Sequence, residues 1–224
     1  MIVLMSAFLL LSAFSCGGGN KANSTSEQSE ETAVNVPQFD ADSAYLYVKN
    51  QVDFGPRVPN TKEHVACGNY LAGQLEAFGA QVTNQYADLI AYDGTLLKAR
   101  NIIGSYKPES KKRIALFAHW DTRPWADNDP DEKNHNTPIL GANDGASGVG
   151  ALLEIARLVN QQQPELGIDI ILLDAEDYGA PQFYTGQHKE EFWCLGSQYW
   201  ARNPHVQGYN ARFGILLDMV GGEG

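Results

Sequence analysis

Residues 168–177 read IDIILLDAED, an apolar run that is interrupted once and ends in three carboxylates. A short apolar run of this kind is typical of a strand buried on both faces. Two further runs have the same form, RIALFA at 113–118 and FGILLD at 213–218. Because helix-type sequences separate these runs, we expect crossover connections between parallel strands and helices on both faces of the sheet. The sequence thus predicts an α/β fold, a three-layer sandwich around a mixed, mostly parallel sheet.

The flanking sequence predicts the other elements. Helices are expected at 43–54, at 61–78, at 146–160 and near 195–202. Asp42 is the expected N-cap of the first helix, while Thr61 is expected to open the second helix and Gly79 to be its C-cap. Its candidate core positions are Val65, Tyr70, Leu71, Leu75 and Phe78. Residues 81–92 and 95–106 flank an Asp93-Gly94 turn, which predicts a β-hairpin.

The amino-terminal segment differs from the rest. Residues 1–15 form an apolar run too short to span a bilayer, followed by Cys16, which is typical of a signal peptide with a lipoprotein-type cysteine. The alternative is a buried strand. Residues 17–38 are polar and predict a flexible tether. We therefore expect an exported protein of the cell envelope, anchored by lipid at Cys16 in the periplasm or outer membrane, with a catalytic domain at 39–224.

Composition limits the function. The formal net charge of −11 argues against a nucleic-acid partner, because binding phosphate needs clustered Lys and Arg. A carboxylate-rich cleft attracts cations instead, either metal ions or a substrate amine. Cys67 lies among helical apolar positions, so a small buried thiol is favoured over a disulfide.

Chemistry-bearing residues follow each predicted parallel strand. His119-Trp120-Asp121 follows the first strand and Glu176-Asp177 the second, while Asp218 ends the third; Asp144 lies in GANDGASG, directly before a helix. Each acidic group alone is typical of a helix cap or a solvated turn. Because open α/β sheets bind ligands at the carboxyl ends of their strands, we expect these groups to converge there. A divalent cation would offset their mutual repulsion.

The order of the motifs resembles that of the zinc aminopeptidase and glutaminyl cyclase superfamily from about Asp40 onward. The motifs that carry this resemblance are Gly55-Pro-Arg, HWD at 119–121, GANDGASGV at 141–149, DAED at 174–177, LGSQYWA at 195–201 and LLD at 216–218. HWDTRPWAD, EDYG and LGSQYW are similar to the bacterial glutaminyl cyclases in particular.

The resemblance implies one bound Zn²⁺, with Asp144 and Asp177 as ligands and Glu176 as the catalytic acid and base. Asp218 matches a carboxylate that assists catalysis in the single-zinc cyclases and binds a second metal in the aminopeptidases. His119 and Asp121 match the H-x-D pair, whose histidine is a ligand of that second metal in the aminopeptidases. The third zinc ligand is a histidine expected beyond Gly224, so the domain is expected to lack its C-terminal part. His64, His135, His188 and His205 are interpreted as surface or loop residues.

The expected reaction is conversion of an N-terminal glutamine of a peptide to pyroglutamate with release of ammonia. Trp120, Trp125 and Trp193 are candidates for the substrate pocket, with Trp200 as a further one, although aromatic residues are more often core. An aminopeptidase with two metal ions is the first alternative. A non-catalytic lipoprotein that binds peptide or metal is the second. We expect a monomer.

Overall fold

The centre of the sheet is a pair of parallel strands. In the computed structural model, which describes residues 35–222, β3 (Arg113–His119) pairs with β4 (Gly167–Leu173), with Arg113 opposite Gly167 and His119 opposite Leu173. All seven residues of β4 are buried, as its mostly apolar sequence predicts, and Asp169 is the one charged residue among them. The residues that follow both strands therefore lie at the same edge of the sheet.

The predicted hairpin joins this pair through its second strand. β1 (Gln81–Ile90) and β2 (Leu96–Tyr106) are antiparallel, and β2 also pairs antiparallel with β4. The short strand β5 (Gly214–Leu216) lies parallel to β3, which gives the strand order β1-β2-β4-β3-β5. All three residues of β5 are exposed at the edge of the sheet, so the prediction of a strand buried on both faces was wrong for this apolar run. The mixed sheet is confirmed. Its antiparallel share is larger than the sequence suggested, because β2 lies inside the sheet and contributes two antiparallel pairings.

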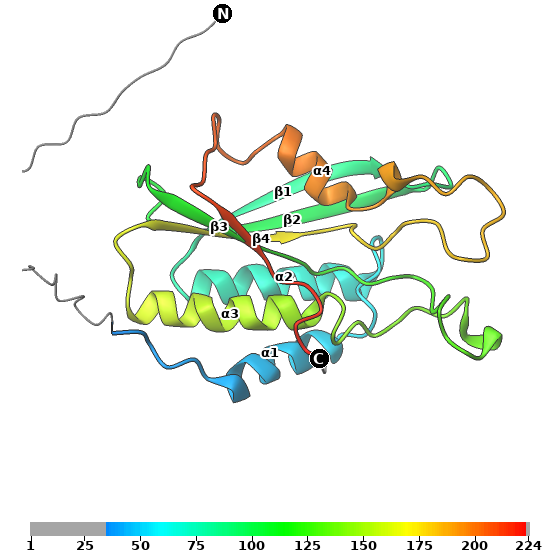
Figure 1. Ribbon diagram of the computed structural model, residues 1–224, viewed down its shortest axis with the longest axis horizontal. Helices are drawn as coiled ribbons and strands as arrows, with labels where there is room; N and C mark the ends of the chain where they lie inside the picture. Colours follow the sequence, from blue (N-terminus) through cyan, green and yellow to red (C-terminus); the bar gives the residue numbers. More distant parts are fainter. Residues whose placement is uncertain (1–34, 223–224) are drawn as a thin grey trace, which may run out of the picture. The chain divides into compact units, whose positions relative to one another are not determined.

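Helices cover both faces of the sheet, as predicted (Figure 1). α2 (Lys62–Ala77) and α3 (Ala146–Gln161) pack on one face, with α1 (Ala41–Val52) against α3. α4 (Leu195–Arg202) lies on the opposite face. Two 3-10 turns, Glu132–Asn134 and Glu190–Phe192, interrupt the long connections. The main core lies between the sheet and α2 and α3, and its fully buried residues include Leu71, Leu75, Leu152, Leu153, Ile170 and Leu172.

The helix termini match the sequence prediction with one exception. Thr61 caps α2 through a hydrogen bond from the backbone N–H of His64, and Gly79 follows α2 with a φ of 78°. α1, in contrast, is capped by Asp40, whose carboxylate accepts from the backbone N–H of Asp42. The prediction of Asp42 as the cap was wrong by two residues, because both aspartates suit an N-cap and only Asp40 has the extended conformation that the position requires.

Val65 was wrongly predicted to be core. It is 56% exposed, whereas Leu71 and Leu75 of the same helix are fully buried. Cys67 is buried as a free thiol, as expected, and burial raises its pKa to about 12.

The predicted signal peptide, Cys16 and all of the predicted tether up to residue 34 lie outside the described residues. Within residues 35–222, none of the helices has the length and apolar character needed to span a membrane.

Candidate metal and catalytic centre

His119, the last residue of β3, lies at the centre of the acidic cluster. It is 4% exposed, and its Nε2 lies 2.9 Å from Oδ1 of Asp144 and 3.6 Å from Oδ1 of Asp218. Its Nδ1 lies 3.5 Å from Oδ1 of Asp121. Burial lowers the pKa of His119, but Asp121, Asp144 and the charge of Glu176 outweigh burial and raise it to about 11. Segments far apart in the sequence thus meet at one imidazole.

Asp121 fixes the turn that follows β4. Its carboxylate is completely buried and accepts hydrogen bonds from the backbone N–H groups of Glu176 (3.0 Å) and Asp177 (3.1 Å). Burial raises the pKa of Asp121, but His119 and these two N–H groups outweigh burial, and the net shift is downward. Asp121 therefore stays ionised and ties the turn after β3 to the turn after β4.

The turn that carries Glu176 and Asp177 is strained. Ala175, directly before them, has a φ of 52° and is fully buried. A non-glycine residue in this region costs of order 1 kcal/mol or more, and such residues cluster at functional sites. Asp177 is 7% exposed, and its Oδ2 has no hydrogen-bond partner among the described residues. Burial, together with the charges of Asp121, Asp144 and Glu176, raises the pKa of Asp177 to about 8.

Asp144 is presented by a tight loop at the start of α3. The next residue, Gly145, has a φ of 90°, and a Cβ there would lie 2.8 Å from the carbonyl oxygen of Asp121. Only glycine fits that close approach. The loop therefore passes directly beside the turn that carries His119 and Asp121, as its small residues predicted.

Asp218 lies just beyond β5 and is held against the same loop. The backbone N–H of Val220 donates to Ser147 Oγ (3.0 Å), and that of Gly221 donates to Asn143 Oδ1 (2.8 Å). The side chains of Asp144 and Asp218 are 36% and 41% exposed. They form the open side of the cluster, while His119 and Asp177 form its buried side.

Two sets of donor atoms in the described residues could hold a metal ion. One consists of His119, Glu176 and Asp177, the other of His119, Asp144 and Asp218; within each, one ligand atom per residue lies within 4.8 Å of the others. An imidazole nitrogen with carboxylate oxygens is a donor set that suits Zn²⁺. The unpartnered Oδ2 of Asp177 and the crowding of carboxylates fit a cation. Asp144 and Asp177 fall in different sets that share His119, so their common ion stays a prediction.

Arg57 has a positioning role that sequence reasoning missed. It is completely buried, and its guanidinium donates to the carbonyl oxygens of Trp120 (3.4 Å), Leu140 and Gly141 (2.8 Å). It therefore clamps the turn after β3 to the loop that carries Asp144. The Gly55-Pro-Arg motif was the available signal, but a sequence does not show which carbonyl groups an arginine will reach.

Arg123 has a similar role on the other side of the cluster. Its Nε and Nη2 donate to the two carboxylate oxygens of Asp127 (2.7 and 2.6 Å), and its Nη1 donates to the carbonyl oxygen of Asp177 (3.1 Å). Its guanidinium carbon lies 4.8 Å from the centre of the Trp193 ring. The backbone of Asp177 is thus held by Asp121 from one direction and by Arg123 from another.

The tryptophans correct one expectation. Trp120 was predicted to line the substrate pocket, but it is completely buried in the main core, where its Nε1 donates to the carbonyl oxygen of Arg100 (3.1 Å) and its ring stacks on His64. Successive side chains of an extended segment point in opposite directions, and His119 and Asp121 on either side of Trp120 face the cluster, so Trp120 points into the core. Trp125 and Trp193 are half-buried and flank Arg123. Trp200 contacts Phe117 and Tyr209 and lines no part of the cluster described here.

His64 was wrongly interpreted as a surface or loop residue. It is 3% exposed on α2, and its Nε2 lies 2.9 Å from Asp174. The side chain of His205 is also buried, at 3% exposure. The sequence gives no direct sign of either burial.

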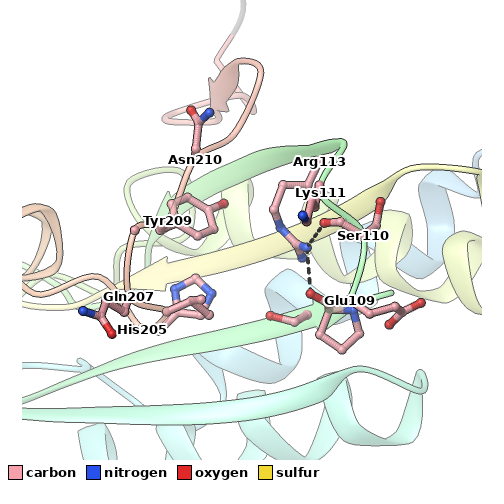
Figure 2. Close-up of a pocket in the computed structure, with 12 residues that line it drawn as sticks. Glu109, Ser110, Lys111, Arg113, His205, Gln207, Tyr209 and Asn210 are labelled. Atoms are coloured by element: carbon pink, nitrogen blue, oxygen red, sulfur yellow. Dashed lines mark hydrogen bonds between the residues drawn. The ribbon is translucent and has the colours of Figure 1, made fainter.

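A small cavity of about 110 Å³ opens onto the cluster. It is lined by His119, Leu173, Glu176, Cys194, Ser197, Leu216 and Asp218. A larger cleft of about 470 Å³ lies at the opposite end of β3, between Arg113 with the turn before it and the loop that carries His205 and Tyr209 (Figure 2). Because β3 separates Arg113 from His119, the larger cleft is remote from the acidic cluster.

Comparison with known proteins places the chain in a family. Residues 101–224 match the model of Peptidase family M28. The chain is similar to the crystal structure of Bacteroides thetaiotaomicron glutaminyl cyclase bound to N-acetylhistamine, with 95% identity, a TM-score of 0.84, and coverage of 84% of this chain and 65% of that one. The same values describe its similarity to a leucine aminopeptidase precursor from Bacteroides thetaiotaomicron VPI-5482.

A more distant relative is the glutaminyl-peptide cyclotransferase of Drosophila melanogaster, which is 24% identical over 189 residues, or 79% of this chain and 48% of that protein. The chain thus spans less than two thirds of the length of each of these relatives. The match to the family model covers the strands and turns that carry His119, Asp144, Glu176, Asp177 and Asp218, and the chain belongs to Peptidase family M28.

Proposed function

We propose that this chain carries the catalytic centre of a zinc-dependent glutaminyl-peptide cyclotransferase, which converts an N-terminal glutamine of peptides to pyroglutamate and ammonia. One observation carries the proposal: Glu176, Asp218 and His119 line the same small cavity, whose other walls include Leu173 and Leu216. A narrow, partly apolar cavity of this kind suits a neutral amide side chain. The similarity to the Bacteroides thetaiotaomicron glutaminyl cyclase supports the same substrate class.

The residues that would hold the zinc ion are Asp144 and Asp177, with a histidine as the third ligand. Bound there, zinc would supply a Lewis acid for the amide carbonyl of the substrate. The donor types and the unpartnered Oδ2 of Asp177 fit such an ion. His119 and Asp121 would orient the ligands, since Asp121 holds the backbone of Asp177.

Glu176 would move the proton. The substrate α-amine nitrogen forms a bond to the side-chain amide carbon, the bond from that carbon to the amide nitrogen breaks, and ammonia leaves. Glu176 would accept a proton from the attacking nitrogen and return it to the departing one, so it ends the reaction in its starting state. Asp218, which lines the same cavity, would keep this carboxylate and the substrate amine in place.

The experiment is a direct comparison of two substrates. The zinc-loaded full chain is incubated with a glutamine-initiated dipeptide and, separately, with leucine p-nitroanilide; ammonia and p-nitroaniline are measured, and metal content is determined by atomic absorption. Release of ammonia alone, with one zinc per chain, is the expected result. Release of p-nitroaniline without ammonia would discard the proposal.

An aminopeptidase is the second candidate, and a specific observation favours it. The two donor sets together offer four carboxylates besides His119, enough oxygen ligands for two neighbouring ions that activate water. The similarity to a leucine aminopeptidase precursor points the same way. Two metal ions per chain and cleavage of leucine p-nitroanilide would identify it. If neither ammonia nor p-nitroaniline is released, the remaining hypothesis is favoured, a non-catalytic lipoprotein that binds peptide or metal.

We also propose that the protein is exported, processed before Cys16 and lipid-anchored in the cell envelope as a monomer. The apolar run that ends at Cys16 supports this proposal. Incorporation of labelled palmitate in cells that express the chain, and its loss in Cys16→Ala, would test it.

A further inference from the structure

The side chain of Cys194 contacts the proposed catalytic carboxylate. Its Sγ lies 3.2 Å from Oε1 of Glu176, and both residues line the small cavity. Cys194 and Cys67 are free cysteines, and only Cys194 is close to the cluster. A thiol is a weak donor, but a carboxylate is a charged acceptor, which strengthens the hydrogen bond.

The backbone holds this contact in register. The N–H groups of Cys194, Leu195 and Gly196, at the start of α4, donate to the carbonyl oxygens of Glu176, Ala175 and Asp174, each at 3.0 Å. These are N–H groups that a helix leaves without partners in its first turn. The amino terminus of α4 is therefore anchored on the turn that carries Glu176.

Local strain also marks the position. Cys194 has a φ of 53° and a ψ of 37°, a left-handed conformation that is strained for a non-glycine residue. Ala175, whose carbonyl oxygen accepts from the N–H of Leu195, has a φ of 52°. A strained residue thus lies in each of the two segments that these hydrogen bonds join, and the thiol of Cys194 lies against the carboxylate of Glu176.

We propose that Cys194 is a positioning residue for Glu176: its thiol donates to Oε1 and leaves Oε2 as the oxygen that accepts and returns the proton of the reaction. This inference rests on the proposed function. Without the thiol, the carboxylate rotates among more orientations, so fewer bound substrates meet it in a productive geometry.

Kinetics of three variants test the role. Cys194→Ala loses the donor, and kcat is expected to fall about tenfold while KM changes less than about twofold, the effect of one lost hydrogen bond to a charged group. Cys194→Ser keeps a donor and is expected to retain at least about one third of the kcat. Cys67→Ala, the matched control in the core, is expected to lower Tm and leave kcat unchanged. A Cys194→Ala variant with wild-type kcat, or a Cys194→Ser variant as slow as Cys194→Ala, would overturn the inference.

A spectroscopic measurement makes the test independent of activity. The infrared S–H stretching band of Cys194 is assigned in the full chain by its absence from Cys194→Ala. In Glu176→Ala this band is expected to move to the frequency of a thiol without an acceptor, while the band of Cys67 stays in place. A Cys194 band that does not move would refute the hydrogen bond and the inference with it. A chain that releases no ammonia but whose band moves would instead refute the proposed function.

Discussion

His64 and Asp174 form a buried pair in which Nε2 of the histidine lies 2.9 Å from both carboxylate oxygens of the aspartate. The two side chains are 4% and 0% exposed. Asp174 also accepts from the backbone N–H groups of Arg100 (2.6 Å) and Ala175 (2.7 Å). The pair therefore joins α2, β2 and the turn that carries Glu176.

Removing the histidine should be costly, because it leaves the buried carboxylate without its main partner. His64→Ala is expected to lower the free energy of unfolding by about 3–5 kcal/mol, measured by urea denaturation. His188→Ala, at an exposed histidine, is the control and should change it by less than about 0.5 kcal/mol. Equal effects of the two changes would show that the pair adds nothing to stability.

Glu176→Gln should separate catalysis from metal binding. The amide cannot take the proton, so the rate of ammonia release is expected to fall about 10²–10⁴-fold. The zinc content, measured by atomic absorption, should stay at the wild-type level, because Asp144 and Asp177 are unchanged. A variant that keeps its rate would remove Glu176 from the mechanism.

Asp121→Asn should weaken metal binding without touching a proposed ligand. The carboxylate accepts from two backbone N–H groups and faces His119, and an amide has only one oxygen with which to do so. Zinc affinity is expected to fall about 10–100-fold in a competition titration with a chelator. Asp88→Asn, at an exposed aspartate paired with Lys98, is the control and should not change the affinity.

Gly148→Ala should displace Asp218. A Cβ at this position would overlap with the carbonyl oxygen of Leu217, although alanine favours a helix interior by about 1 kcal/mol. We expect lower thermal stability and weaker zinc binding. Gly73→Ala in α2 is the control, because no atom lies near the new Cβ and only the helix propensity of the residue changes. This variant should raise the free energy of unfolding by about 0.5–1 kcal/mol. If both changes raise the free energy of unfolding, the backbone at Leu217 can move away from the new Cβ at little cost, and the prediction is wrong.

The metal-free chain should lose stability as pH rises. The folded pKa of Asp177 is about 8 against a usual value of 3.8, so between these values the folded chain holds a proton that the unfolded chain has released. His119, raised from 6.5 to about 11, acts in the same direction above pH 6.5. The free energy of unfolding is therefore expected to fall from pH 5 to pH 8.

Asp177 alone contributes at most about 1.4 kcal/mol per pH unit to this slope. Chemical denaturation of metal-free wild type and Asp177→Asn at several pH values measures its share. The variant should show the shallower slope, and identical slopes would contradict the assignment. Added zinc should stabilise the wild type more at pH 8 than at pH 5, because binding displaces these protons.

The fold was largely predictable because each buried strand has an apolar run that ends in a polar residue. β3, β4 and the hairpin around Asp93 followed directly from that pattern. The pairing of β2 with β4 did not, because strand order depends on how segments distant in sequence pack together. The positions of Asp42 and Val65 were also predicted wrongly. Asp40 and Asp42 are both suitable N-caps, so the sequence does not decide between them. Val65 is apolar but lies on the exposed side of its helix.

The convergence of the candidate site could be predicted from the sequence, but its supports could not. The ends of β3 and β5 and the loop before α3 bring His119, Asp218 and Asp144 together, while the roles of these residues stay predictions. Arg57 and Cys194 act through contacts with backbone or side chains far along the chain, and such contacts leave no periodic trace in the sequence. Trp120 was wrongly placed at the site because its neighbours in the sequence belong to the site, whereas its own side chain points into the core.

The hydrogen bonds that hold the segment after Asp218 link the two exposed carboxylates of the cluster. Val220 donates to Ser147 Oγ and Gly221 donates to Asn143 Oδ1, and both acceptors flank the loop and helix start that present Asp144. A substitution at Asn143 would therefore disturb Asp144 and Asp218 together, so the two carboxylates cannot be repositioned independently of each other.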